Sequence, residues 1–285
     1  ETFNDVIVFD TTVLSCGQQG TILRVDLRDN SWSSSRIPSS PRLNKIFASS
    51  SLDSVFVAGH GSTLLRGDKD SWQWNPVAVP AESDLYAVFF ADDKHGWVVG
   101  EEKVSGGGII FFSDGSSWAQ QFLTPQPLFD VYALSTEIVF ACGGGGGIYR
   151  LTKGSWALLP SPISSSLRAI HALSSTEQWA VGDGGVILRS DGAAWSRWSY
   201  TGTSSLTSIS GSPDSDVIIG AADGSILQVG PKVSGKTVAT SLPRAVRVLG
   251  VHTGSVCLFK GDEIRGEEGQ TPSLLFRGDM YYTPS

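Results

Sequence analysis

Four histidines and a run of five glycines are the first residues in this sequence that could support chemistry. The histidines are spread along the chain, and no Cys and His have the spacing of a zinc site. The glycine run at 143–147 lacks the Lys-Ser/Thr pair and the helix that a phosphate-binding loop requires, so we interpret it as a turn. We expect no metal and no cofactor. The histidines are His60, His95, His171 and His252.

The three cysteines, Cys16, Cys142 and Cys257, cannot all pair with one another. Two of them lie in the apolar runs VLSCG and VFACG, which are typical of buried strands. A free cysteine in such a place behaves as a small hydrophobic residue. We therefore predict buried free thiols rather than a disulfide framework.

The charge and the apolar content of the chain exclude two kinds of partner. There are 21 Lys and Arg against 28 Asp and Glu, a net charge of −7, whereas nucleic-acid binding depends on clustered basic residues. No stretch approaches 18 consecutive apolar residues, so we predict no membrane span. A hydrophobic content of 40% is sufficient for a folded core.

An internal repeat organises the whole sequence. The phrase WAVGDGGVILRSDGAAW (179–195) recurs as LSCGQQGTILRVDLRDNSW, FVAGHGSTLLRGDKDSW, WVVGEEKVSGGGIIFFSDGSSW and FACGGGGGIYRLTKGSW, and more distantly as IIGAADGSILQVG. The glycine that ends the first apolar run falls at Gly17, Gly59, Gly100, Gly143, Gly182 and Gly220. An upstream apolar marker falls at Val6, Ile46, Val88, Val131, Ile170, Ile209 and Val248. Seven copies of about 40 residues therefore fill the chain, which predicts one domain over 1–285.

Each copy reads as four short strands separated by Gly, Ser and Asp, without sustained helical periodicity. In the fifth copy strand one is Leu167–Leu173, and the segments WAVG and GVILRS are strands two and three. A four-stranded sheet cannot bury both of its faces alone, but a radial arrangement buries each sheet against its neighbours. The sequence therefore predicts an all-β, seven-bladed β-propeller with four-stranded antiparallel blades.

A short Asp-Gly turn precedes a tryptophan in several copies. We expect Asp114 and Asp191 to accept hydrogen bonds from their own turns, and the glycine that follows each to adopt a positive φ. The tryptophan then starts strand four and packs between blades. The strand-four tryptophans are Trp32, Trp72, Trp118, Trp156 and Trp195, whereas Trp97 and Trp179 occupy strand two.

The segments SDGSSW (113–118) and SDGAAW (190–195) resemble shortened Asp-boxes of sialidase-type propellers. The longer repeat resembles bacterial envelope propellers and the photosystem II assembly factor family. A sialidase would need an arginine cluster, a Tyr–Glu pair and an acidic Asp. The element Ser35-Arg36-Ile37-Pro38 and the late Tyr281 and Tyr282 resemble parts of that set. However, Arg24, Arg66, Arg150 and Arg189 share one strand-three position and should point outward from four separate blades, so a sialidase-like glycosidase is only a remote alternative.

We predict a non-catalytic scaffold that binds a protein through one loop face, and the alternative is a carbohydrate-binding lectin. A lectin that binds once per blade should repeat a polar and aromatic set in its loops, but these loops vary between copies. We expect a monomer. The surface, rich in Ser and Gly and poor in Lys, resembles that of secreted or cell-envelope propellers, although free cysteines leave a cytoplasmic location open.

The third copy points to the binding face because it alone lengthens the turn between strands two and three. It inserts seven residues, 101–107, between Gly100 and Gly108, where the fifth copy has Asp183-Gly184. Insertions in repeat proteins gather on one face, often the binding face. A mildly acidic face would suit a basic or polar partner. The predicted site consists of Glu101, Glu102, Lys103, Val104, Ser105, Asp183 and Asp223.

The strand-four register gives a stability prediction. Because Trp195 holds the recurrent position between blades, we expect Trp195→Ala to lower the free energy of unfolding by about 3–5 kcal/mol. Trp198 lacks a counterpart in most copies, so Trp198→Ala should cost less. Chemical denaturation of the two variants measures the difference, and equal midpoints would show that the strand has been placed wrongly.

Overall fold

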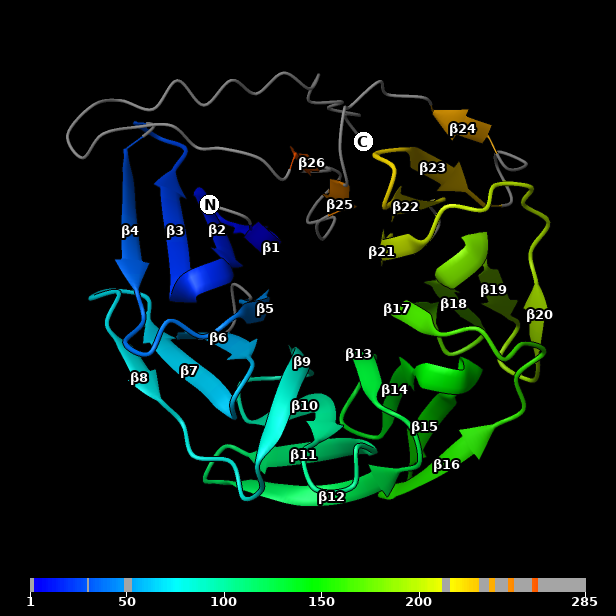
Figure 1. Ribbon diagram of the computed structural model, residues 1–285, viewed down its shortest axis with the longest axis horizontal. Coiled ribbons are helices and arrows are strands. Elements are labelled where there is room, and N and C mark those ends of the chain that lie inside the picture. Colours follow the sequence, from blue (N-terminus) through cyan, green and yellow to red (C-terminus); the bar gives the residue numbers. More distant parts are fainter. Residues whose placement is uncertain are drawn as a thin grey trace.

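The computed structural model describes residues 3–29, 31–48, 53–211 and 216–230, and the backbone of three short strands at 236–238, 246–248 and 258–260. These residues form antiparallel sheets arranged around a common axis, and the first strand of each sheet lies nearest that axis (Figure 1). Consecutive strands pair within each sheet. The predicted all-β propeller with four-stranded antiparallel blades is confirmed.

Six sheets have four strands each, and we number them as blades 1 to 6 in chain order. Blade 1 contains β1 (Phe3–Phe9), β2 (Thr12–Gly17), β3 (Thr21–Asp26) and β4 (Trp32–Arg36). Blade 2 contains β5 (Leu43–Phe47), β6 (Ser54–Gly59), β7 (Thr63–Asp68) and β8 (Trp74–Pro76). Blade 3 contains β9 (Ser83–Phe90), β10 (His95–Glu102), β11 (Gly108–Asp114) and β12 (Trp118–Thr124).

The remaining blades repeat this order. Blade 4 contains β13 (Leu128–Ala133), β14 (Ile138–Gly143), β15 (Ile148–Thr152) and β16 (Ser155–Leu159). Blade 5 contains β17 (Leu167–Ser174), β18 (Glu177–Gly182), β19 (Ile187–Ser190) and β20 (Trp195–Arg197). Blade 6 contains β21 (Leu206–Ser210), β22 (Val217–Ala221), β23 (Ile226–Val229) and β24 (Lys236–Val238).

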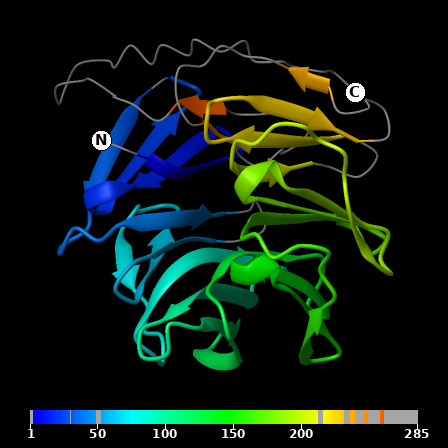
Figure 2. The same cartoon turned by 45° about the vertical axis from the view of Figure 1, so that its right-hand side comes forward.

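The predicted count of seven blades is wrong, because the described residues form six four-stranded blades. The seventh copy contributes a two-stranded sheet, β25 (Val246–Val248) and β26 (Leu258–Lys260), in which β25 contacts blades 1 and 6 (Figure 2). This copy lacks the Asp-Gly turn and the strand-four tryptophan that recur in earlier blades. Cys257, His252, Tyr281 and Tyr282 lie outside the described residues.

Every four-stranded blade has a β-bulge near the start of strand one, opposite the end of strand two. In blade 4, Leu128 pairs with Gly143 and Asp130 pairs with Cys142, so Phe129 is the extra residue. The same shift of register occurs in the other five blades. The extra residues are Asn4, Asn44, Tyr86, Phe129, Arg168 and Thr207.

The bulge explains the glycine that marks the repeat. A Cβ at Gly100, Gly143 or Gly182 would lie 2.0 Å from the carbonyl oxygen of the residue that precedes its strand-one pairing partner. No side chain can occupy that space, since real Cβ atoms do not approach so closely. In blade 6 the equivalent residue is Ala221, which pairs with Leu206, so the predicted marker Gly220 is one residue out of register.

Apolar side chains from facing sheets form the core between neighbouring blades. One cluster joins Phe140 and Ile148 of blade 4 to Ile170, Leu188 and Trp195 of blade 5. Trp97 and Trp179 are fully buried, and Trp156 and Trp195 nearly so, which confirms four predicted positions. Cys16 and Cys142 are buried free thiols, as predicted.

Trp72 does not start strand four of its blade, contrary to the prediction. It has a left-handed φ of 54° and lies before β8, which begins at Trp74. Gly67 permits this change because a Cβ at that residue would lie 2.5 Å from the Trp74 ring. The extra Trp in this copy therefore shifts the strand by two residues.

The turns that contain glycine behave as the sequence predicted. The Asp191 carboxylate accepts hydrogen bonds from the backbone N–H groups of Ala193 and Ala194, both at 3.0 Å, and Gly192 has a φ of +90°. Residues 144–146 of the glycine run form a single 3-10 turn that leads into β15. No helix in the described ranges has the length and apolar character needed to cross a membrane.

The bulge gives a prediction for Gly182. Gly182→Ala forces a methyl group against the carbonyl oxygen of Ser166, so we expect a loss of about 1–3 kcal/mol of unfolding free energy, as for an overpacked core. The matched control is Gly144→Ala, because the nearest atom to a Cβ there is Gln126 Cβ at 3.1 Å, a contact that a shift of a few tenths of an ångström relieves. Denaturant melts of both variants test this, and equal midpoints would contradict it.

Candidate functional site

The turns between strands two and three and the bulged residues lie on the same face of the propeller. In each blade strand two ends opposite the bulge, as Gly143 does opposite Leu128, and the turn follows directly. The topology therefore brings to one face two sets of residues that are separate in the sequence. This is the face on which the sequence analysis placed its candidate site.

The insertion in blade 3 is an ordered extension of the β10–β11 hairpin. Glu101 pairs with Gly108, and the Glu102 carboxylate accepts hydrogen bonds from the backbone of Val104 at 3.0 Å and of Ser105 at 2.7 Å. The backbone N–H of Lys103 donates to the carbonyl of Glu82 at 3.0 Å. The hairpin is thus tied to the preceding linker, and Val104 at its tip is 90% exposed.

Asp84 is the buried carboxylate of this face. It accepts hydrogen bonds from the Lys103 ammonium and from the backbone N–H of Gly61 at 2.9 Å, and its oxygen lies 3.3 Å from His60 Nδ1. Burial raises the pKa of Asp84, but these bonds outweigh burial, so its pKa lies below the usual value. Burial also lowers the pKa of His60. The ionised carboxylate therefore joins the turns of blades 2 and 3.

Tyr86, the bulged residue of blade 3, links the insertion to blade 4. Its hydroxyl donates to the Glu101 carboxylate at 2.9 Å. Its ring lies 5.8 Å from the His60 ring and 5.6 Å from the Phe129 ring, between centroids. Burial and the bond to Glu101 raise the pKa of Tyr86, so the hydroxyl stays protonated and remains a donor.

Arg168, the bulged residue of blade 5, completes the row. Its guanidinium carbon lies 4.6 Å from the centroid of the Phe129 ring, within the range of a cation–π contact. The guanidinium also donates two hydrogen bonds to the Asp183 carboxylate, at 2.9 and 2.6 Å. We call this row the face cluster, and it consists of His60, Asp84, Tyr86, Glu101, Lys103, Phe129, Arg168 and Asp183.

The structure divides the sequence-predicted site into three groups. Glu101, Lys103 and Asp183 belong to the face cluster, whereas Glu102 and Ser105 hold the hairpin turn and Val104 forms its tip. Asp223 accepts a bond from the backbone of Ser225 at 2.8 Å in the blade 6 turn, apart from the cluster. The analysis missed Tyr86, Phe129 and Arg168, although each precedes the apolar marker of its copy by two residues.

The face cluster has the chemistry of a binding surface. His60 and Asp84 resemble a base with its orienting acid, but no hydroxyl or thiol in the described part of the chain hydrogen-bonds to His60. Nucleophilic catalysis would need that group. Within the same residues no three His, Cys, Asp or Glu side chains gather as a metal site. Half-buried aromatic rings flanked by charges are instead suited to recognition.

Further along the first strands of the blades, side chains from different blades contact one another near the axis of the ring. The Lys45 ammonium lies 3.9 Å from the Asp5 carboxylate and 4.0 Å from that of Asp130, which joins blades 1, 2 and 4. A ladder of rings follows, with successive centroid distances of 4.8, 4.6 and 4.4 Å. The ladder consists of Phe47, Phe89, Tyr132 and His171.

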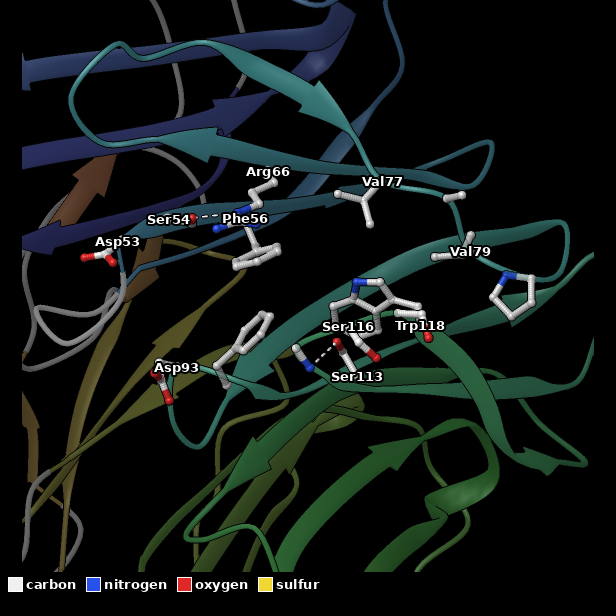
Figure 3. A pocket seen from close by; sticks show the side chains of 15 residues that line it. Asp53, Ser54, Phe56, Arg66, Val77, Val79, Asp93, Ser113, Ser116 and Trp118 are labelled. Carbon is white, nitrogen blue, oxygen red and sulfur yellow. Dashed lines mark hydrogen bonds between the residues drawn. The ribbon is translucent and has the colours of Figure 1, made fainter.

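Two grooves open between blades, away from the face cluster. Groove A, about 600 Å³, lies between blades 2 and 3, where Phe56, Arg66 and Trp118 meet (Figure 3). Groove B, about 330 Å³, lies between blades 4 and 5 and has Phe140, Arg150 and Trp195 at the same repeat positions. Arg66 and Arg150 thus line grooves between blades, although an outward orientation was predicted for them.

Comparison with solved structures shows the fold. YCF48 bound to D1 peptide is similar with a TM-score of 0.61 and 20% identity, over 81% of this chain and 78% of that one. YCF48 from Cyanidioschyzon merolae has a TM-score of 0.68 and 14% identity over 90% and 92%. The WD40 β-propeller domain of Doa1 has a TM-score of 0.75 and 12% identity over 92% and 89%. No protein-family model and no curated protein sequence matches the chain.

The buried ring of His171 gives a pH prediction. Burial lowers its pKa to about 4, against about 6.5 in an unfolded chain, so the unfolded state binds more protons between these values. Stability should therefore fall by roughly 3 kcal/mol as the pH drops from 6.5 to 4. His171→Gln, which keeps a donor for the Gly211 carbonyl, should flatten this part of the profile. Denaturant melts across this pH range measure both profiles. If the stability of the wild type and that of His171→Gln fall in parallel as the pH drops, the prediction is wrong.

Proposed function

We propose that this chain is a non-catalytic propeller that binds a protein or peptide partner through the face cluster. The observation that carries the proposal is the continuity of the cluster, which runs from blade 2 to blade 5 through ion pairs, hydrogen bonds and ring contacts. Its members include half-buried Tyr86 and Phe129 and exposed Lys103 and Arg168. Aromatic and charged side chains of this kind dominate binding energy at protein interfaces.

The charge of this face favours a basic or polar partner segment. Acidic side chains outnumber basic ones among the cluster and the neighbouring turns, where Glu102 and Asp223 add to Asp84, Glu101 and Asp183. Lys103 and Arg168 are the basic members, and each already pairs with a carboxylate. An acidic excess attracts basic segments and accelerates their encounter.

The similar folds support a peptide-binding role without establishing it. One of them, YCF48, is bound to a D1 peptide, and fold similarity alone leaves the partner of this chain open. The resemblance of the repeat to Asp-box and envelope propellers is the basis for proposing a secreted or cell-envelope protein that acts as a monomer. A glycan partner is the alternative that the following experiment separates.

The test uses peptides selected by panning a random library against the immobilised protein. Replacing residues 101–107 by Asp-Gly removes the hairpin extension, so we expect the dissociation constant of the selected peptides to rise at least about tenfold. The melting temperature should fall as well, because the replacement also removes the Lys103 partner of buried Asp84 and the Glu101 acceptor of Tyr86, so affinities are measured below that transition. Fluorescence anisotropy measures the affinity of each peptide.

Matched variants show which face binds. Phe129→Ala and Lys103→Ala alter the face cluster, whereas Lys94→Ala removes an exposed lysine from the opposite end of the same blade. Peptides that bind all variants equally would place the site elsewhere. Binding that requires glycan, and that free sugar competes away on a glycan array, would support the lectin alternative instead.

A further inference from the structure

In blades 2 and 5 the strand-three arginine hydrogen-bonds to the first residue of strand two. In blade 5 Arg189 donates to the Glu177 carboxylate, from Nε at 3.2 Å and from a terminal nitrogen at 3.0 Å. In blade 2 the Nε of Arg66 donates to the Ser54 hydroxyl at 2.7 Å. In blade 4 the corresponding position is Ile138, which cannot accept a hydrogen bond. Arg150 therefore loses the partner that its counterparts have.

No described carboxylate balances the charge of the Arg150 guanidinium. Its Nε is buried and has no hydrogen-bond partner, and the guanidinium forms no ion pair with any described residue. Its carbon lies 5.5 Å from the centroid of the Phe140 ring. A buried donor without a partner lowers the stability of the fold, and more so when it is charged. Arg24 of blade 1 also has an Nε without a hydrogen-bond partner. Its terminal nitrogen Nη2, however, lies 3.8 Å from Asp26 Oδ2, and this carboxylate balances the charge of the arginine.

Groove B surrounds this arginine with apolar surface. Arg150 is the one charged residue among those that line it, and no carboxylate is present in that lining. The walls are formed by Phe140, Leu159, Pro160, Pro162 and Trp195. A concave, mainly apolar pocket of about 330 Å³ with a single convergent charge has the size and character of a site for a small ligand.

Groove A has the same architecture as groove B, but the charge of its arginine is balanced. Ser54 satisfies the Nε of Arg66, and the carboxylates of Asp53 and Asp93 line the same groove (Figure 3). The two grooves share the aromatic residue of strand two and the strand-four tryptophan of the next blade. They differ in charge, because groove A contains carboxylates beside its arginine and the lining of groove B contains none. Of the two, only groove B is therefore suited to an anionic ligand.

We propose that groove B binds a carboxylate attached to a compact apolar group. The carboxylate would accept hydrogen bonds from the terminal nitrogens of the Arg150 guanidinium, in the paired geometry that arginine favours. The apolar group would pack against Phe140 and Trp195. Such a ligand is either a free aryl or alkyl carboxylic acid or the C-terminal residue of a peptide. This inference is independent of the face cluster.

Two acids and their neutral amides test the proposal. Phenylacetate represents the free acid and N-acetyl-phenylalanine the peptide terminus, with phenylacetamide and N-acetyl-phenylalaninamide as uncharged controls. Titrations followed by NMR should shift the side-chain Nε–H resonance of Arg150, and the amides should bind at least about tenfold more weakly. Tighter binding of phenylacetate indicates a free acid, and tighter binding of N-acetyl-phenylalanine indicates a peptide end. Equal binding of acids and amides would overturn the proposal.

Three variants locate the site. Arg150→Gln should abolish acid binding, and Ile138→Glu should do the same by giving Arg150 the internal carboxylate that Arg189 has in Glu177. Arg66→Gln is the matched control in groove A and should leave binding unchanged. Melting temperatures accompany each titration, so that Arg150→Gln still decides the question if Ile138→Glu is unstable. Undiminished binding to a folded Arg150→Gln would refute the assignment to groove B.

Discussion

The close approach of a strand-one carbonyl oxygen to the end of strand two is the constraint on which this fold depends. At three blades a Cβ on the facing residue would lie 2.0 Å from that oxygen, so only glycine fits without movement of the backbone. In these blades the contact lies beside the bulge that adds one extra residue to strand one. Because the bulge recurs at the same step of all six four-stranded blades, the repeat can vary widely elsewhere and still build equivalent sheets.

The bulge also decides what the propeller can present to a partner. A bulged residue lies outside the strand pairing, so its side chain is free to serve the surface. In blades 1 and 2 that residue is Asn, and both amides donate to a carbonyl of the next blade at 2.7 Å. In blades 3 to 5 it is Tyr86, Phe129 or Arg168, whose side chains contact one another across blades. The same backbone feature thus bonds neighbouring blades to each other on one side of the ring and brings aromatic and charged side chains together on the other.

The sequence was sufficient for the architecture because turn chemistry and spacing repeat locally. The Asp191 turn, the glycine turn at 144–146 and the buried Trp195 all follow from residue type and position. The number of blades could not be predicted, because the apolar marker at Val248 predicts one strand and says little about strands three and four. The register error at Gly220 arose because blade 6 has Ala221, and not a glycine, at the residue that pairs with the start of strand one.

The candidate site was harder to predict, since its members meet across blades. The unusual length of the turn in the third copy pointed to residues 101–107, and Glu101 and Lys103 of that turn do contact Tyr86 and Asp84. Their partners, Tyr86 and Asp84, lie in strand one, where alternation marks them only as strand residues. The partner of a strand-three arginine is equally hidden, because it lies on an adjacent strand at a diagonal position. Glu177, Ser54 and Ile138 occupy that position in three blades and leave the arginine ion-paired, hydrogen-bonded or orphaned. One substitution in a repeat can therefore convert a structural charge into one available to a ligand, without altering the sheet that carries it.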